Sequence, residues 1–390
     1  MDEVVVVEAV RTPIGRRGGG LSSVHSADLL AAVQRELIDR SGVDPHEVEQ
    51  VVGGCVSQVG MQGFNVTRNA WLIAGLPLEA AATTVDSQCG SSQQAVNLAT
   101  ALLGSGVVDG AVACGVENMS RVPMGSSVGQ GVGKAVTRTY WDKFEYTSQF
   151  EAAERIAEEW GITREETDAL GLESQQRALR AWSEGRFGSQ VVPIDAPDLG
   201  EDGRRARTTH RVERDEGLRE TSMEALSKLK PVARPDGVHT AGTSSQVSDA
   251  AAAVLLMTRH KADELGLRPR ARVVDTCLVG SDPVLMLTGP ITATQRLLSR
   301  TGMTIADIDL VEINEAFASV VLAWEREVQP DHERVNPNGG AIAIGHALGS
   351  TGSILLTKAL HELERADLST ALVTMCCGGG LATGTIIERL

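Results

Sequence analysis

Apolar and polar positions along the first 117 residues predict alternating strands and helices. The runs at 4–9 (VVVVEA) and 51–56 (VVGGCV) are predicted strands, and the helical spacing of apolar residues at 27–40 predicts a helix between them. TTVDS predicts an extended segment, followed by a small-residue turn at 89–92 and a helix from about Gln93 to Gly104. VVDGAVACGVE then has the composition of a buried strand. This pattern is typical of an α/β fold.

The pattern changes between residues 118 and 241 and then returns. This middle part has more Gly, Arg, Pro and charge, two amphipathic helices (FEAAERIAEEW and ETDALGLESQQRALRAW) and few strand-like runs, so we expect an insertion that covers a site. The later alternation predicts the strands SDAAAAVLLMT, ARVVDTCLVG, DIDLVEI and ALVTMCCGG and helices at 292–302, 316–328 and 350–365.

The two α/β parts are similar in size and rhythm, which indicates a duplicated α/β unit with the insertion in its first copy. A chain of 390 residues is long enough for two or three domains. We expect an N-terminal domain of residues 1–117 plus 242–266, a covering loop domain of 118–241 and a C-terminal domain of 267–390.

The composition is that of a soluble protein, with 42% hydrophobic and 22% charged residues. No apolar run approaches the ~18 to 20 residues that span a bilayer, and the N-terminus has acidic residues where a secretory signal needs basic ones. We therefore expect a cytoplasmic protein without a membrane span. The net charge of -15 argues against a nucleic-acid surface as the main function.

One local basic cluster contrasts with the negative net charge. A solvated basic loop is the commoner explanation of such a cluster, and a site for a polyanionic small molecule such as coenzyme A (CoA) is the alternative. Its members are Arg204, Arg205, Arg207, Arg211, Arg214 and Arg219.

The six cysteines include no C-x-x-C pair, so we expect no metal site. Without a secretory signal they are expected to be reduced thiols. Cys89 stands out, because a thiol on a small-residue turn at a helix N-terminus is expected to be exposed and to favour the thiolate. A buried structural cysteine explains the same residue equally well.

Three further segments have residues suited to catalysis. His346 lies in a Gly-rich segment before a helix, where a ligand can approach closely, although an ordinary loop histidine is the commoner case. Asn314 follows a strand and could simply cap the next helix. Cys376 precedes a glycine run whose backbone N–H groups could form an oxyanion hole. The glycines around His346 do not match a phosphate-binding loop.

Together and in this order, these segments resemble the thiolase superfamily along the whole chain. The matching segments are EAVRTPIG, VDSQCGSSQQA, HTAGTSSQVSDAAAA, NEAFA, GGAIAIGHALGSTG and MCCGGG. Within the superfamily the chain is most similar to actinobacterial thiolases of steroid side-chain breakdown, in QFEAAERIA, GITREE, GLESQ, EGRF, GLRET and EINEAFASVVLAW. The resemblance implies α/β/α/β/α layers, CoA thioesters as substrates, no permanently bound cofactor, and a homodimer or homotetramer.

The resemblance also implies roles for individual residues. Cys89 would be the acylated nucleophile, His346 its base and Cys376 a second acid/base. Asn314 would hold a water that, with His346, stabilises a thioester oxygen, and the backbone N–H groups of Cys89 and Gly378 would stabilise the tetrahedral intermediate. For CoA, Ser245 matches a serine that contacts the pantetheine arm, and Arg219 lies in the segment that contacts the nucleotide.

The chain departs from the family pattern at several positions. Ala347 replaces the usual proline after the histidine and is expected to loosen that loop. Ser87 stands where related steroid thiolases have a cysteine. Gln149 and Phe150 replace a Met-Gly pair of short-chain biosynthetic thiolases, which indicates a bulky or unusual acyl group. Cys377 is interpreted as structural.

The sequence leaves three alternatives to thiolysis of a bulky 3-ketoacyl-CoA. One is an acetoacetyl-CoA-forming or natural-product thiolase, since cleavage and condensation share one site. Another is a decarboxylating ketosynthase-like enzyme, which pairs its cysteine with two histidines and lacks a second thiol. The third is a non-catalytic acyl-CoA or sterol-binding protein with the same fold.

Overall fold

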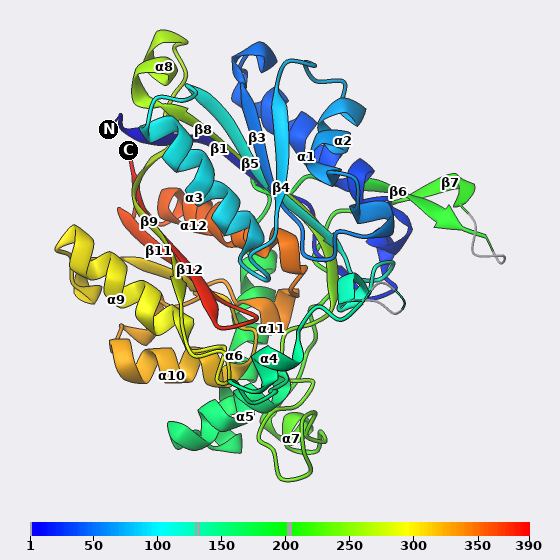
Figure 1. Ribbon diagram of the computed structural model, residues 1–390, viewed down its shortest axis with the longest axis vertical. Coiled ribbons are helices and arrows are strands. Elements are labelled where there is room, and N and C mark those ends of the chain that lie inside the picture. The colour runs from blue at the N-terminus through cyan, green and yellow to red at the C-terminus, as the bar shows by residue number, and fades with distance from the viewer. Residues whose placement is uncertain (1, 129–130, 132, 201–204) are drawn as a thin grey trace.

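The computed structural model describes residues 2–128, 131, 133–200 and 205–390, without the side chain of Arg205. In this part of the chain the main sheet has ten strands in the order β10-β11-β12-β9-β1-β8-β5-β3-β4, with β2 (Gly15–Arg16) beside β8 (Figure 1). One half of the sheet contains β1 (Val4–Arg11), β3 (Gln50–Gly54), β4 (Ala81–Val85), β5 (Gly110–Asn118) and β8 (Ser248–Thr258). The other half contains β9 (Ala271–Gly280), β10 (Leu310–Ile313), β11 (Thr370–Cys377) and β12 (Leu381–Arg389).

The two halves repeat the same arrangement of strands. In the first half β3 is parallel to β5, and β8 is antiparallel to both β5 and β1. In the second half β10 is parallel to β11, and β12 is antiparallel to both β11 and β9. A parallel bridge between Val311 and Val335 occupies the place that β4 has beside β3. The α/β fold class is therefore confirmed, and the duplication is visible in the topology.

Helices lie on both outer faces of the sheet halves and between them (Figure 1). Helices α1 (Ser26–Ser41) and α2 (Val66–Ile73) cover the outside of the first half, and α9 (Gly289–Thr301) and α10 (Ala318–Val328) cover the outside of the second. Helices α3 (Ser91–Gly104) and α12 (Thr351–Arg365) lie between the halves. Three apolar clusters fill the spaces between these five layers.

The two central helices approach each other closely near their N-termini, because small residues face each other there. The Ser353 N–H donates to Ser92 Oγ at 2.9 Å. A Cβ on Gly352 would lie 2.3 Å from the Gln93 backbone nitrogen, and one on Gly54 would lie 2.3 Å from the Ser92 nitrogen. A larger side chain at Gly352 would separate the two helix N-termini, and one at Gly54 would move α3 away from β3.

The insertion between β5 and β8 contains α4 (Arg138–Trp141), α5 (Gln149–Glu159), α6 (Arg164–Ser183) and α7 (Met223–Ser227). It also contains a hairpin of β6 (Ile194–Leu199) and β7 (Arg205–Val212), which extends away from the main body (Figure 1). This hairpin was not expected from the sequence, because its arginine-rich second strand has no apolar alternation. Short helices α8 (Arg259–Glu264) and α11 (Ala341–Ile344) complete the described set.

A buried ion pair fixes the insertion to the first strand. The Arg11 guanidinium donates to both carboxylate oxygens of Asp215 at 2.8 and 3.1 Å, and neither side chain is exposed. The Ile14 N–H and the Trp182 indole N–H donate to the same carboxylate. Such full hydrogen bonding is what makes a buried pair tolerable, and here it joins the later part of the insertion to the end of β1. Among the described residues, no helix has the length and apolar character needed to cross a membrane.

Replacing Gly352 by alanine tests the central crossing. The added Cβ has no space beside the Gln93 nitrogen, so we expect Gly352→Ala to lower the free energy of unfolding by about 1–3 kcal/mol. Urea unfolding followed by circular dichroism measures this. Gly104→Ala, at the end of α3, is the matched control, because no atom lies nearer than 3.9 Å to its added Cβ. Equal effects of the two changes would contradict the argument.

Candidate active site

Four segments that carry the predicted site residues meet where the central helices begin. Cys89 lies between β4 and the first turn of α3, and His346 lies between α11 and α12. Asn314 follows β10, whereas Cys376 is near the end of the adjacent strand β11 and Gly378 follows it. Because parallel strands end at the same edge of a sheet, and because α3 and α12 cross at their N-termini, these residues converge.

Cys89 is buried and not exposed, which corrects the expectation from sequence. Only 8% of the residue is accessible. Burial raises the pKa of its thiol to about 11, although the nearby backbone N–H groups of Gly378 and of Cys89 itself lower it in part. The resting cysteine is therefore a neutral thiol at physiological pH, and it needs a base to become a nucleophile.

His346 is buried and held in one orientation. Its backbone N–H donates to the Gln246 carbonyl at 3.0 Å and to Ser248 Oγ at 3.1 Å, so it is not an ordinary loop histidine. The ring Nδ1 lies 2.7 Å from Thr351 Oγ1, whose hydroxyl donates to the Ala347 carbonyl at 2.9 Å. Since the hydroxyl proton is used there, Thr351 accepts from Nδ1–H.

This tautomer leaves the lone pair of His346 on Nε2. The amide Nδ2 of Asn314 lies 3.5 Å from this nitrogen. Burial lowers the pKa of the imidazole to about 4, so the ring is neutral at physiological pH. The arrangement gives a neutral base whose Nε2 accepts one long hydrogen bond, from the Asn314 amide.

Asn314 does not cap the helix that follows it. Helix α10 begins at Ala318 and its N-cap position is Phe317, so the capping alternative is wrong. The Asn314 side chain is fully buried, and its Oδ1 has no hydrogen-bond partner among the described residues. An unpaired buried amide oxygen is costly in a fold, which makes this atom a candidate for binding a water or ligand.

The two cysteines at the end of β11 differ in their surroundings. Cys376 is fully buried in the cluster that contains Ala316 and Phe317, and burial together with the neighbouring Cys89 raises the pKa of its thiol well above the ordinary value. The Cys377 thiol lies 3.8 Å from the Met375 carbonyl oxygen. A Cβ on Gly90 would be 2.6 Å from Cys377 Sγ, so this sulfur fills the space under the Cys89 turn.

Two buried carboxylates hold the loops around the site, and the sequence analysis did not assign either a function. Glu117 accepts from the backbone N–H groups of Val56, Ser57 and Gly349 and from the Gln62 amide at 2.7–3.1 Å. Glu315 accepts from Ser174 Oγ at 2.6 Å, the Ile342 N–H at 3.1 Å and Asn336 Nδ2 at 3.2 Å. Both bind the Gly-rich segment that contains His346. Their only signal in the sequence is an acidic residue at the end of a strand.

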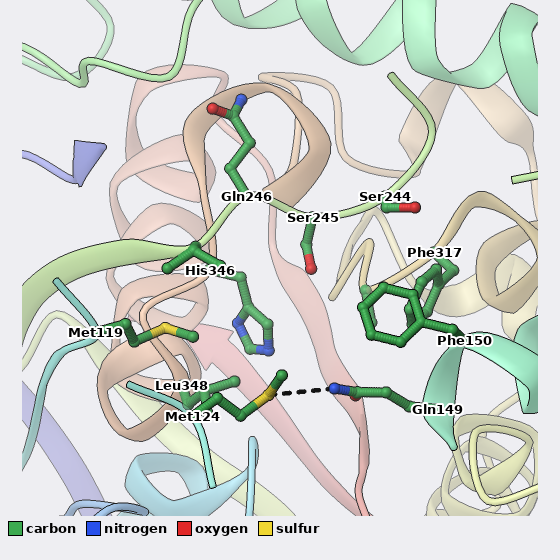
Figure 2. Close-up of a pocket in the computed structure, with 12 residues that line it drawn as sticks. Met119, Met124, Gln149, Phe150, Ser244, Ser245, Gln246, Phe317, His346 and Leu348 are labelled. Atoms are coloured by element: carbon green, nitrogen blue, oxygen red, sulfur yellow. Dashed lines mark hydrogen bonds between the residues drawn. The ribbon is translucent and has the colours of Figure 1, made fainter. Parts of the chain in front are cut away.

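A mainly apolar pocket of about 60 Å³ opens beside His346 (Figure 2). Gln149 Nε2 lies 3.3 Å from Met124 Sδ, and the Phe150 and Phe317 rings are 5.4 Å apart in an edge-to-face arrangement. Of the predicted site residues, His346 and Ser245 line this pocket, whereas Cys89, Cys376 and Asn314 do not. The full lining consists of Met119, Met124, Gln149, Phe150, Ser244, Ser245, Gln246, Val247, Ala316, Phe317, His346 and Leu348.

The arginine cluster does not form one surface at this pocket. Arg219 is exposed, and its Nη2 lies 3.4 Å from Oε1 of Gln246, a pocket residue. Arg211 is on β7 and pairs with Asp195 and Glu213, while the Arg214 guanidinium lies 5.6 Å from the centre of the Trp182 ring. Arg207 is also on the hairpin. Arg204 and the side chain of Arg205 are outside the described residues. The CoA alternative thus applies to Arg219 at most.

Metal ligands were not expected, and within the described ranges the structure brings together no group of three or more His, Cys, Asp or Glu side chains suited to a metal ion.

Ala347 lies between His346 and the short turn that leads to α12. Its φ of -81° is close to the range that a proline ring imposes, and no described residue accepts a hydrogen bond from its N–H. His346 forms a parallel bridge with Val247, so its backbone is extended, as the residue before a proline requires. The Ala347 carbonyl accepts from Ser350 N–H, Ser350 Oγ and Thr351 Oγ1, which holds the loop without a proline.

We therefore expect Ala347→Pro to stabilise the protein by about 0.4–1 kcal/mol, because it restricts the unfolded chain without loss of a native hydrogen bond. Chemical denaturation measures this difference. Ala343→Pro is the control, since the Ala343 N–H donates to the Gly340 carbonyl at 3.0 Å and that bond would be lost. A lower stability of Ala347→Pro would show that the loop needs conformations that proline forbids.

Comparison with known proteins gives one consistent result over the whole chain. Residues 4–260 match the thiolase N-terminal domain and residues 267–389 match the thiolase C-terminal domain. The chain is 46% identical to the steroid 3-ketoacyl-CoA thiolase FadA6 of Mycobacterium tuberculosis, over 100% of this chain and 95% of that protein. It is 41% identical to an acetyl-CoA acetyltransferase of Syntrophomonas wolfei, over 100% and 99%.

The crystal structure of the Bacillus anthracis acetyl-CoA acetyltransferase superposes with a TM-score of 0.91 at 37% identity and covers 100% of this chain and 99% of that chain. These matches decide against the ketosynthase-like alternative. The chain belongs to the thiolase family and is an acyltransferase.

Proposed function

We propose that this thiolase cleaves a bulky 3-ketoacyl-CoA with CoA, or forms it by the reverse condensation, through an acyl group on Cys89. The observation that carries the proposal is the meeting of two groups where α3 and α12 begin. One group is a neutral His346 with its Nε2 beside Asn314, and the other is the Cys89 thiol beside Cys376 and the backbone N–H of Gly378. Together they supply a base, a thiol nucleophile, a second thiol and backbone donors.

In the first step the Cys89 sulfur attacks the ketone carbon of the substrate, and His346 Nε2 accepts the thiol proton. The backbone N–H groups of Gly378 and Cys89 lie beside the sulfur and are suited to donate to the oxyanion of the tetrahedral intermediate. The bond between the ketone carbon and the α-carbon then breaks. Acetyl-CoA leaves as its enolate, or propionyl-CoA does so from a substrate with an α-methyl group, and Cys376 supplies the proton to the α-carbon.

The enolate oxygen needs hydrogen-bond donors while the carbon–carbon bond breaks. We assign this role to His346 and to a water bound by Asn314, whose buried Oδ1 has no partner among the described residues. The proton on His346 then passes to the Cys376 thiolate, which restores both groups. In the second step the thiol of an incoming CoA attacks the acyl-Cys89 thioester, His346 accepts its proton, and the same proton passes to the Cys89 thiolate that is released. The exchange of one thioester for another is nearly thermoneutral, which accounts for a reversible reaction.

Two observations support a bulky acyl group in the substrate: the lining of the pocket and the name of one relative. Apolar side chains of Met119, Met124, Phe150 and Phe317 surround the space next to His346. Met124 is 48% and Phe150 38% exposed, so both can move outward without opening the core. FadA6, a relative at 46% identity, is a steroid thiolase by name. We therefore place a steroid-derived or similarly large acyl group in this pocket.

Acetoacetyl-CoA is the second candidate substrate. The cavity volume of about 60 Å³ suits a small acyl group without any movement. An acetyl-CoA acetyltransferase is among the relatives at 41% identity. The Gln149–Met124 contact lies at the pocket in the described conformation. A bulky acyl group requires this contact to break, whereas the acyl group of acetoacetyl-CoA does not.

We further propose that Ser245 and Arg219 contact CoA at the mouth of the pocket, where Gln246 joins them. We also retain the expected domain boundaries, the cytoplasmic location and the homodimer or homotetramer. Self-association is supported by β4, which ends the order of strands in the main sheet, and by Phe64 and Leu78 nearby, which are 94% and 70% exposed.

Incubation with labelled acyl-CoA tests the role of Cys89. We expect a thioester on the Cys89 peptide by mass spectrometry, because the site needs only this thiol and His346 to exchange an acyl group with CoA. Cys89→Ser should remove the thioester, whereas the matched variant Cys376→Ser should retain it, since Cys376 acts only on the α-carbon.

In steady-state assays we expect a higher kcat/KM with a bulky 3-ketoacyl-CoA than with acetoacetyl-CoA.

A label that survives in Cys89→Ser would overturn the assignment of the nucleophile. Binding of acyl-CoA without any label on the unsubstituted protein would favour the non-catalytic binder. Equal or greater kcat/KM with acetoacetyl-CoA would leave the thiolase mechanism intact and reject the bulky substrate.

The pH dependence follows from the burial of His346. A lowered pKa keeps the imidazole unprotonated, and therefore able to accept a proton, down to about pH 4. We expect kcat/KM to stay level through pH 6.5, the ordinary pKa of histidine, and to fall only near pH 4. Initial rates across pH 4–8 measure this, with circular dichroism at each pH to confirm that the protein is folded. An acid limb centred near pH 6.5 would show that His346 is solvated in the active form.

A further inference from the structure

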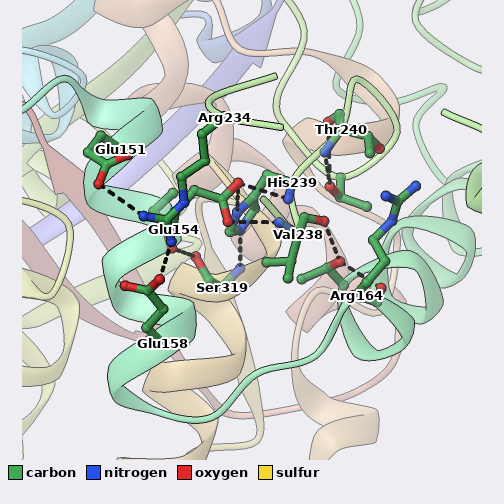
Figure 3. A network of polar contacts seen from close by, with 12 residues as sticks. Glu151, Glu154, Glu158, Arg164, Arg234, Val238, His239, Thr240 and Ser319 are labelled. Carbon is green, nitrogen blue, oxygen red and sulfur yellow. Dashed lines mark hydrogen bonds and ion pairs between the residues drawn. The ribbon is translucent and has the colours of Figure 1, made fainter. Parts of the chain in front are cut away.

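Glu154 and His239 form a buried carboxylate–histidine pair (Figure 3). The His239 ring contacts Phe317, a residue of the pocket wall. Glu154 is on α5 of the insertion, and His239 is in the segment that leads to Ser244 and Ser245. His239 Nδ1 lies 3.2 Å from Glu154 Oε1, and the two side chains are 0% and 1% exposed. Neither residue lines the pocket, and the proposed chemistry uses neither.

The Glu154 carboxylate connects α5 to the His239 segment through three contacts. It accepts from the backbone N–H of Val238 at 2.8 Å and of His239 at 3.1 Å, and the third contact is the ion-pair contact with the imidazole, whose Nδ1 has no aligned hydrogen bond among the described residues. Although burial alone raises the pKa of Glu154, the adjacent His239 imidazole and the two backbone N–H groups lower it overall. The carboxylate is thus ionised at neutral pH, and each of its two oxygens has a partner. A Cβ on Gly237 would lie 2.5 Å from Glu154 Oε1, so the segment passes very close to it.

His239 connects this pair to α10 of the second half. The backbone N–H of Ser319 donates to His239 Nε2 at 3.4 Å, so Nε2 is the acceptor and Nδ1 is the protonated nitrogen that faces Glu154. The imidazole also packs edge-to-face against the Phe317 ring, with centroids 5.6 Å apart. The other aromatic ring described next to Phe317 is that of Phe150, 5.4 Å away in the pocket.

The backbone around Phe317 is fixed by the same segment. Ser244 forms an antiparallel bridge with Phe317, and the Ala318 N–H donates to the Thr243 carbonyl at 3.0 Å. The Phe317 backbone is therefore held in place, while its ring lies in the buried apolar cluster of α5 and α10 and between the His239 and Phe150 rings. Removal of the imidazole leaves a space behind the ring into which the ring can turn.

We propose that Glu154 and His239 are positioning residues that set the acyl-group selectivity of this thiolase by holding the Phe317 ring against the pocket. This inference rests on the proposed function, because it takes the pocket to be the acyl site. The pair keeps Phe317 forward, so a small acyl group still contacts this ring, whereas a bulky one is accommodated by outward movement of Met124 and Phe150 on the exposed side of the pocket. Without the pair the wall recedes, a small acyl group loses contact, and a large one retains it.

The test compares kcat/KM for acetoacetyl-CoA and for a bulky 3-ketoacyl-CoA in a set of variants. In His239→Ala we expect the ratio to shift toward the bulky substrate by about tenfold, the size of effect that a small change in an apolar pocket produces. Glu154→Gln keeps the size of the side chain but cannot accept at both former oxygen positions, so it should shift the ratio in the same direction by less. His239→Asn retains a hydrogen-bond donor near Glu154 but has no ring. If His239→Ala does not fold, the kcat/KM ratio of His239→Asn is measured in its place, and the same shift toward the bulky substrate is expected.

A double-substitution cycle separates positioning from a general loss of stability. Phe317→Leu alone should shift the ratio, and the addition of His239→Ala should change it little further, because both act through one ring. His361→Ala is the matched control, since His361 is also a buried histidine bonded to backbone, with Nε2 3.0 Å from the Ala9 carbonyl oxygen, but it lies outside the pocket. It should leave the ratio unchanged.

Three results would overturn the inference: an unchanged ratio in every folded His239 variant, independent effects of His239→Ala and Phe317→Leu, or the same shift in His361→Ala. The unsubstituted protein distinguishes this failure from failure of the proposed function. If it forms acyl-Cys89 and turns over the bulky substrate with the higher kcat/KM, the proposed function stands and only the positioning role is rejected. If it does neither, the proposed function has failed first.

Discussion

The close contact of α3 and α12 at their N-termini is the constraint on which the site depends. Gly352, Ser353 and Ser92 permit this contact because they have little or no side chain there. Each helix belongs to a different copy of the duplicated α/β unit, and each is preceded by one of the reactive loops. A wider separation of the two helices would move the nucleophile away from its base while both copies stayed folded. The crossing therefore unites two α/β units into one catalytic centre.

The same contact determines the resting chemistry, because it buries the thiol. A helix N-terminus favours an anion by about 0.3–1 kcal/mol at an exposed position. Raising a thiol pKa from 9.0 to about 11 corresponds to about 3 kcal/mol in the opposite direction. Burial thus outweighs the helix dipole at Cys89, and it likewise keeps His346 neutral. The site begins as an uncharged pair, and charge develops only when a substrate provides a carbonyl carbon and the backbone donors become useful.

The local pattern of apolar, polar and glycine residues was sufficient to predict most helices and strands and to find the segments that carry the candidate catalytic residues. The predicted strands at 248–258 and 271–280 agree with β8 and β9, and the fold class is confirmed. The exposure of Cys89 was predicted wrongly, because a turn in the sequence does not reveal what packs on it. The β6–β7 hairpin was missed for lack of alternation. Glu154 and His239 could not be paired from sequence, since the Glu154–His239 contact joins residues 85 positions apart.

The pocket and the reactive centre are built from different parts of the chain. Gln149 and Phe150 come from the insertion, Ser244 and Ser245 from the segment that leads into β8, and Phe317 from the second copy. The reactive residues instead lie at the ends of elements common to both copies. A change in the insertion can therefore reshape the acyl wall without displacing Cys89 or His346. Glu154 holds α5 to the His239 segment, and His239 contacts Ser319 and Phe317 of the second copy. Selectivity therefore depends on how these three parts are joined as well as on which side chains face the pocket.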